Sequence, residues 1–224
     1  MSRVKGKPTA GPARRRRRVP RAERQEQMLA VALPLFAKRG YHAVSVDEVA
    51  AGAGVTKPMV YAYFDSKEGL FEACASRAAE RLVAALERSA AEHDDPGERM
   101  WHGLLAVFGW IAEHREAWAV LYGAPGGGGS PFAAPAARAS DRMAAIVAGQ
   151  FAETLRGQGM GAVAEQHAEP MAHAFVAATV GMGRWWLEHP EEPAELQALR
   201  VMQLAWSGID NVMKGRMWIP PSPH

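Results

Sequence analysis

The chain has 224 residues, of which 48% are apolar, and a formal net charge of +2; this length suits one large domain or a small domain joined to a larger one. Helix-favouring residues are frequent and β-branched runs are scarce, so we expect an all-α fold. The single cysteine, Cys74, excludes an internal disulfide and fits a reducing cytoplasm. The basic N-terminus lacks the apolar core of a secretory signal, and the longest apolar run, 175–182, is too short to span a bilayer.

Positive charge is concentrated at the front of the chain. Residues 1–70 carry 14 Lys and Arg against 6 Asp and Glu, a net of +8, whereas residues 71–224 carry 12 against 18, a net of −6. A basic front and an acidic back predict that the front binds a polyanion.

Residues 1–20 are rich in Gly, Pro and Arg and have little to bury, which predicts a flexible arm. A run of this kind can be a solvated tail, a targeting signal or a ligand for anionic membranes, and it can also enter the DNA minor groove. The basic module that follows the arm favours nucleic acid. The run consists of Arg14, Arg15, Arg16, Arg17 and Arg18.

The first predicted helix covers residues 21–39, where apolar residues recur at i, i+4 and i+7 from Leu29. Pro34 lies inside this helix and is expected to kink it, because proline has no N–H and clashes with the preceding turn. Gly40 suits the C-cap.

Two shorter helices are predicted next. "SVDE" makes Ser45 the N-cap and Glu48 its capping-box partner, and "GAGV" ends this helix a few residues later. Thr56 is the expected N-cap of the second helix, with Pro58 in its first turn. A short helix, a turn that contains glycine and another short helix form a helix-turn-helix. We place this domain at residues 21–66.

The second of these helices has a buried and an exposed side. At 100° per residue, Val60 and Phe64 stack on one face, where they are expected to pack against the two preceding helices. The opposite side is a ridge with a small crest that suits the DNA major groove. Pro58 and Ala62 form the crest, and the flanks carry the i, i+4 pairs Lys57–Tyr61 and Met59–Tyr63.

Lysines and phenols on these flanks predict a DNA contact set, because both side chains reach phosphate oxygens and base edges. Lys57 is the first candidate for a guanine contact. Helix N-termini bind phosphate, which adds Lys67 at the start of the next helix and the hydroxyl or N–H of Ser45. Each tyrosine alone also fits a half-buried packing residue; the whole set within a +8 segment favours DNA.

Residues 24–73 resemble the DNA-binding domain of the tetracycline-repressor (TetR) family of bacterial regulators, through "LFAKRGY", "SVDEVAAGAGVTKPMVYAYF" and "SKEGLF". The resemblance implies an all-α homodimer with an N-terminal three-helix helix-turn-helix domain and a larger C-terminal effector-binding and dimerisation domain. It also implies a repressor that a small effector releases from double-stranded operator DNA. Family members commonly contact DNA with the residues that match Ser45, Thr56, Lys57, Pro58, Tyr61, Tyr63 and Lys67.

The C-terminal domain is expected at residues 67–217, followed by a tail at 218–224. Glycine-rich and proline-rich breaks divide it into helices. The predicted helices cover about 67–93, the segment after Pro96, 136–156, 164–188 and 192–217, with a loop at 123–135.

This half is rich in Trp, Phe and Met and carries few charges inside its helices, which favours an apolar or aromatic effector. For any one candidate lining residue, plain core packing is the simpler explanation. The candidates are Phe108, Met143, Phe151, Phe175 and Met182.

The last two helices predict a homodimer interface. Apolar residues at spacings of three and four run from Leu199 to Met213, and a strip of small residues runs from Ala174 to Gly181 on the preceding helix. Small residues permit close approach of paired helices. The alternative is that both faces serve only the internal core.

Other classes of protein have weaker support. "GQGMGA" follows a helical segment rather than a strand, and "GGGGS" lacks the lysine of a phosphate-binding loop, so an enzyme with a nucleotide site is not expected. Eight scattered histidines and one cysteine make no metal set, and we expect no metal and no cofactor. An architectural or membrane-surface protein that uses only the arm would bind without sequence preference. We expect a cytoplasmic protein at the bacterial nucleoid, with no membrane partner.

Overall fold

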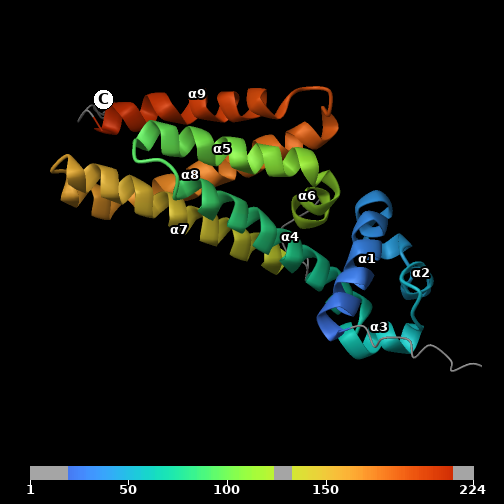
Figure 1. Cartoon of the computed structure of the whole chain (residues 1–224). Coiled ribbons are helices and arrows are strands. Elements are labelled where there is room, and N and C mark those ends of the chain that lie inside the picture. Colours follow the sequence, from blue (N-terminus) through green and yellow to red (C-terminus); the bar gives the residue numbers. More distant parts are fainter. Residues whose placement is uncertain (1–19, 124–132, 214–224) are drawn as a thin grey trace, which may run out of the picture.

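The structure, a computed structural model, describes residues 20–123 and 133–213. Within these ranges the chain forms helices and no strand, which confirms the predicted all-α class. The first three helices form a compact unit at one end, and α4 leads from this unit into a long helical bundle (Figure 1). The helices are α1 (Arg21–Ala43), α2 (Val46–Gly52), α3 (Lys57–Phe64), α4 (Lys67–Ala90), α5 (Pro96–Glu113), α6 (Arg115–Tyr122), α7 (Ala133–Gly157), α8 (Gly161–Glu188) and α9 (Ala194–Met213).

The first helix breaks at Gly40 and not at Pro34. Gly40 has φ 75° and ψ 165°, a conformation that glycine adopts without steric cost, and it is the interior residue of α1 with non-helical angles. Ala32 and Phe36, on either side of Pro34, are 0% and 2% exposed. Both residues belong to one core, and the helix continues through Pro34 as expected, while its non-helical residue is Gly40 and not Pro34.

The helical segment after Pro96 divides in two, which the sequence analysis did not predict. His114 has φ −131° and ψ 43°, and these angles end α5 and start α6. Its Nδ1 lies 3.0 Å from the carbonyl oxygen of Trp110, and the two rings stack with centroids 4.9 Å apart. The short α6 therefore starts anew after α5 and contacts α1, α4 and α8.

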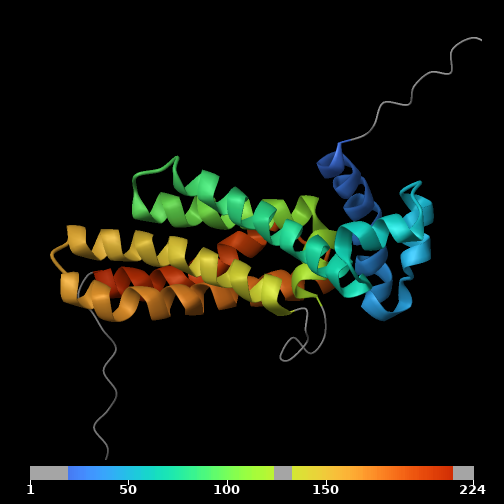
Figure 2. The same cartoon turned by 90° about the horizontal axis from the view of Figure 1, so that it is seen from below.

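The bundle pairs α7 with α8 and α5 with α9, while α4 packs against both α5 and α7. Viewed from below, α4 and α5 lie on one side of the long bundle and α7, α8 and α9 on the other (Figure 2). No helix within residues 20–123 and 133–213 is both long and apolar enough to cross a membrane.

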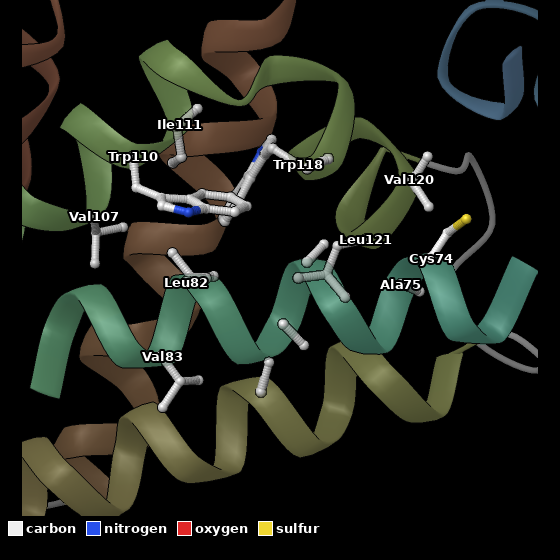
Figure 3. Packing of buried hydrophobic residues seen from close by; sticks show 14 of the residues in the cluster. Cys74, Ala75, Leu82, Val83, Val107, Trp110, Ile111, Trp118, Val120 and Leu121 are labelled. Carbon is white, nitrogen blue, oxygen red and sulfur yellow. The ribbon is translucent and has the colours of Figure 1, made fainter. Parts of the chain in front are cut away.

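Apolar side chains from α4, α5 and α6 meet in the part of the core closest to the helix-turn-helix (Figure 3). Trp118, Ile111 and Leu82 are each 0% exposed. A Cβ atom added to Gly183 of α8 would lie 2.5 Å from Cζ2 of Trp118, so glycine is required there for close packing. Cys74 belongs to this core, and burial raises the pKa of its thiol to about 12; the thiol therefore stays protonated at neutral pH.

Candidate nucleic-acid interface and effector cavity

The start of α2 is fixed by the predicted capping box, which the structure confirms. The N–H of Glu48 donates to Ser45 Oγ at 3.2 Å, and the N–H of Ser45 donates to Glu48 Oε2 at 2.9 Å. Arg39 also donates to Glu48, at 2.5 Å, and this hydrogen bond is the main cause that lowers the pKa of Glu48 to about 2. Because the box uses both the hydroxyl and the N–H of Ser45, a phosphate contact at Ser45 requires a change of hydrogen-bond partner.

The third helix is anchored from behind as predicted. Val60 and Phe64 are 1% and 6% exposed and belong to the core formed with α1 and α2. Thr56 occupies the N-cap with extended angles, and its carbonyl accepts from the N–H of Met59 and of Val60. Its hydroxyl makes no capping hydrogen bond and lies at the surface.

The outward side of α3 brings together several of the candidate DNA contacts. Lys57 and Pro58 are exposed, and Tyr61 is 38% exposed. Met59, which had no predicted DNA role, is 39% exposed on the same helix. A methionine on an outward face can contact the methyl group of thymine, so Met59 joins the candidates. We call Thr56, Lys57, Pro58, Met59 and Tyr61 the recognition surface.

Two other candidates are held against the first helix instead. The guanidinium of Arg21 lies over the ring of Tyr63, 4.7 Å from its centroid, and Tyr63 is half-buried. Lys67 donates from Nζ to the carbonyl of His42 at 3.2 Å and lies over the ring of Tyr41. These contacts join α1 to α3 and α4. The arginines of the arm, residues 14–18, lie outside the described residues.

Lys57 is paired within the protein. Its Nζ lies 2.8 Å from Oδ2 of Asp47 on α2, and both side chains are exposed. This hydrogen bond is the main cause that raises the pKa of Lys57. A phosphate or base that binds Lys57 must therefore compete with Asp47, which also places a negative charge next to the recognition surface.

Asp47→Asn is expected to increase affinity for DNA by no more than about threefold, since an ion pair between two exposed side chains is weak. The amide removes the competing charge and leaves Lys57 available, so the slope of log affinity against log salt should steepen by up to ~0.9. Titrations of a mixed-sequence duplex between 50 and 200 mM salt measure both quantities. Glu87→Gln is the matched control. Glu87 pairs with Arg142 at the same distance of 2.8 Å, but it lies on α4, outside the recognition surface. Equal affinities for Asp47→Asn and the unmodified chain would contradict the prediction.

Two adjoining cavities lie inside the bundle. One is lined by α5, α7, α8 and α9, and we call it the α9 cavity. The other is lined by α4, α5, α7 and α8, and we call it the α4 cavity. Both have mostly apolar linings. The residues that line both are Arg99, Met100, Gln150 and Phe151.

The cavities separate the five candidate effector residues into two groups. Met143, Phe151 and Phe175 line the α4 cavity, and Phe151 also lines the α9 cavity. Phe108 is 0% exposed and packs edge-on against Trp186, with centroids 6.1 Å apart. Neither Phe108 nor Met182 lines either cavity. Arg99 and Gln150 were not predicted, because nothing in the local sequence shows that their side chains turn inward.

Comparison with known proteins identifies the family. The family model described as "Bacterial regulatory proteins, tetR family" matches residues 28–74, and the model described as "Tetracyclin repressor-like, C-terminal domain" matches residues 96–208. Together these two models match well over half of the chain. The chain belongs to the TetR family. The predicted resemblance is confirmed, and the protein is a DNA-binding transcriptional regulator rather than an enzyme.

Relatives of this TetR-family chain extend over both of its parts. The HTH-type transcriptional activator FasR of Mycolicibacterium smegmatis is 30% identical over 204 residues, which cover 91% of this chain and 90% of FasR. A TetR-like regulator from Rhodococcus sp. RHA1 is 31% identical, with a TM-score of 0.69, and the match covers 86% of this chain and 99% of that one. FadR from Bacillus subtilis, solved in complex with stearoyl-CoA, is 17% identical with a TM-score of 0.70, over 82% of this chain and 98% of FadR. The last likeness shows the shared fold alone.

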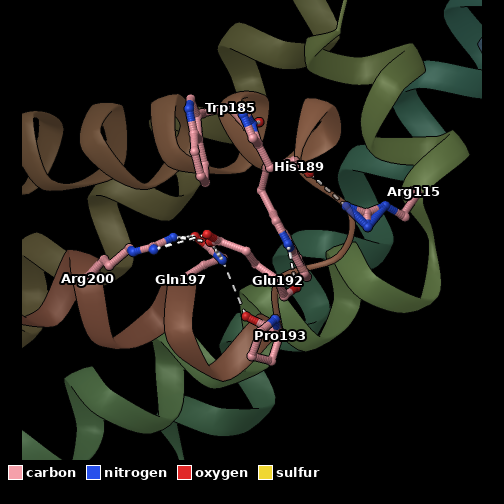
Figure 4. Close-up of polar contacts among 8 residues, drawn as sticks. Arg115, Trp185, His189, Glu192, Pro193, Gln197 and Arg200 are labelled. Atoms are coloured by element: carbon pink, nitrogen blue, oxygen red, sulfur yellow. Dashed lines mark hydrogen bonds and ion pairs between the residues drawn. The ribbon is translucent and has the colours of Figure 1, made fainter.

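The turn between α8 and α9 of this TetR-family chain is held by a polar cluster (Figure 4). Glu192 accepts from Gln197 at 2.9 Å and from Arg200, and the indole N–H of Trp186 donates to the Glu192 carbonyl at 2.8 Å. Arg115 of α6 donates to the carbonyl of Trp186 at 2.8 Å. The cluster therefore fixes the angle between the last two helices and connects them to α6.

Some residues of the predicted dimer seam lie on the surface of α8 and α9, and others do not. Ala174, Ala177 and Gly181 are exposed as a small-residue strip, and Leu199 is 42% exposed. Trp206 instead turns inward and lines the α9 cavity. Leu204, outside the predicted seam, is 73% exposed. The side chains of residues 209 and 213 lie outside the described part of the chain.

Candidate metal ligands do not cluster in the part of the chain that the structure describes. Among residues 20–123 and 133–213, no group of three His, Cys, Asp or Glu side chains is placed to hold a metal ion. His167 and His173, on α8, belong to no such group.

Proposed function

We propose that this regulator binds a palindromic operator as a homodimer and is released from it by a small apolar effector. The observation that carries the proposal is the recognition surface. It is exposed on a helix whose opposite face, Val60 and Phe64, is buried. Such a helix can enter the major groove while its core contacts hold it rigid.

Dimerisation would place two copies of α3 in successive major grooves. In helix-turn-helix dimers the half-sites are about 34–36 Å apart, and the two-fold symmetry of the protein requires a palindrome. The outer face of α8 and α9 supports this arrangement, because the strip at Ala174, Ala177 and Gly181 allows a second copy to approach closely. Leu204 is an exposed apolar side chain that such an interface would bury.

An effector in the two cavities would act through the helices that line them. The α4 cavity is lined by Leu86 of α4, and the same helix joins the bundle to the helix-turn-helix. Glu26 of α1 pairs with Arg77 and Arg81 of α4 at 3.1 and 3.3 Å. A ligand that favours a conformer with a different α4 position would therefore move α1 and change the spacing of the recognition helices.

The apolar linings favour a ligand that is apolar over most of its length. FadR of Bacillus subtilis, which shares the fold, was solved with stearoyl-CoA, a molecule with a long acyl chain. Cavities that adjoin end to end along α5 and α7 suit an elongated ligand of this kind, and the aromatic rings of Phe151, Phe175 and Trp206 also permit an aromatic one.

Selection of bound fragments from genomic DNA tests the proposal. We expect a short palindrome to be enriched, a complex that contains two protomers in sedimentation, and resistance of that complex to competition by random duplex. Recovery of fragments without a shared motif would contradict sequence-specific binding and would favour an architectural protein. Sites that are not palindromic and bind one protomer would contradict the dimer.

The sign of regulation has a second candidate. FasR, which is 30% identical over most of both chains, is named a transcriptional activator. Repression is our first proposal because the resemblance to the tetracycline-repressor family implies it. A promoter reporter with the selected operator distinguishes the two: expression should rise when the regulator is deleted if it represses, and fall if it activates.

Deletion of residues 1–20 is expected to weaken operator binding and to flatten its salt dependence. Each lost phosphate contact should lower the slope of log affinity against log salt by ~0.9, so loss of five arginine contacts would lower it by up to ~4.5. Titration of the selected operator at several salt concentrations measures the slope. Deletion of residues 218–224, which contain no Lys or Arg, is the control. An unchanged slope after removal of the arm would show that the arginines do not contact DNA.

A further inference from the structure

We infer that the effector carries a neutral carbonyl group and that Arg99 and Gln150 bind its oxygen. The inference rests on the proposed effector function and specifies the chemistry of the ligand. It starts from the place where the two cavities adjoin, which we call the waist. Two of the four residues that line both cavities, Arg99 and Gln150, are polar, within linings that are otherwise mostly apolar.

Arg99, which lines both cavities, has one donor without a partner. Its Nη1 donates to Glu153 at 3.0 Å, and its Nη2 donates to the carbonyl of Asp94 at 2.7 Å. Its Nε is buried and has no hydrogen-bond partner. An unpaired buried donor is unfavourable, and a ligand oxygen would satisfy it.

Gln150 is the other polar residue that lines both cavities, and its amide offers a second donor. It is half-buried, and within the described part of the chain its side-chain amide makes no hydrogen bond. The two threonines of the linings differ from it, because their hydroxyls donate to carbonyls of their own helices, each at 2.9 Å. The side chains with an unused donor are therefore the two polar residues shared by both linings.

The charge around Arg99 favours a neutral acceptor over a carboxylate. Glu153 already pairs with the guanidinium, whose side chain is only 17% exposed. A ligand carboxylate would add a second negative charge to this pair and would lose its own hydration, which is costly in an apolar site. A ketone, ester, thioester or amide carbonyl accepts from the free N–H groups without that cost. Apolar groups on both sides of the carbonyl would then fill the two cavities.

Three seven-carbon probes separate these chemistries: 4-heptanone has a central carbonyl, heptane has no acceptor, and heptanoate has a carboxylate. Binding to the full-length chain can be followed through the labelled methyl group of Met100, which lines both cavities. In the unmodified chain we expect 4-heptanone to bind more tightly than heptanoate. In Arg99→Met we expect 4-heptanone to bind about tenfold more weakly, the effect of one lost hydrogen bond, and heptane to bind as before.

Gln150→Met is the second variant and should weaken 4-heptanone binding severalfold, again without an effect on heptane. Arg142→Met is the matched control, because Arg142 is an exposed arginine of α7 that pairs with Glu87 and lines neither cavity. Melting temperatures identify any variant that is unfolded. If Arg99→Met or Gln150→Met is unfolded, the binding measurements on the other one test the inference.

If the variants lose affinity for heptane and 4-heptanone equally, or lose no affinity for 4-heptanone, the inference is overturned while the cavities remain an effector site. Tighter binding of heptanoate than of 4-heptanone, lost in Arg99→Met, would overturn the neutral carbonyl in favour of a carboxylate. If none of the three probes binds the unmodified chain, the proposed effector site fails together with the inference.

Discussion

Phe64→Ala is expected to lower the free energy of unfolding by about 3–5 kcal/mol and to abolish operator binding. Phe64 is 6% exposed and stacks with Val60 on the buried side of α3. The helix has only eight residues, too few to be stable without tertiary contacts. Removal of the ring should therefore release α3, and the recognition surface with it. Urea denaturation and hydrogen exchange of the α3 amides measure the two effects.

Tyr61→Ala is the control for this prediction. Tyr61 lies on the same helix and also loses an aromatic ring, but it is 38% exposed and outside the buried face. We expect it to weaken operator binding with little change in unfolding or in the exchange of α3. If Phe64→Ala keeps the α3 amides protected and still binds the operator, the division of α3 into an anchoring face and a DNA-facing side is wrong.

Trp118→Ala is expected to lower the free energy of unfolding by about 3 kcal/mol. Large-to-small changes at buried aromatic residues cost about 3–5 kcal/mol, and Trp118 is 0% exposed. The lower end of the range is expected because its indole N–H is buried without a hydrogen-bond partner, so truncation removes that cost as well. Since α6 contacts α1 as well as α4 and α8, the loss should also weaken the effect of the effector on operator affinity.

A double-mutant cycle with Gly183→Ala tests the contact itself. Alone, the added methyl group would lie 2.5 Å from the ring of Trp118 and should cost about 1–3 kcal/mol through overpacking. In the Trp118→Ala background the same methyl group enters the vacated space, so the double variant should be more stable than the sum of the two changes predicts, by about 0.5–3 kcal/mol. Strict additivity in chemical denaturation would mean that the two positions do not contact each other.

Much of the DNA-binding part could be predicted because its signals are local. The capping box at Ser45 and Glu48 and the stacking of Val60 on Phe64 depend on residues three or four apart, and helical geometry alone brings such residues together. The split of the segment after Pro96 was missed, because no glycine or proline marks the break at His114, which the Trp110–His114 contact accompanies.

The sequence by itself determined the all-α class, the TetR resemblance, the buried face of α3 and the exposed ridge opposite it. The tertiary structure decided what each polar side chain contacts: Lys57 pairs with Asp47 of another helix, Lys67 is tied to α1, and Arg99 turns toward the waist. It also decided that Phe151 lines both cavities whereas Phe108 packs in the solid core. Periodicity within one helix indicates which side is apolar. Whether that side meets a neighbour, a cavity or a second copy depends on helices far away in the sequence, and only their packing settles it.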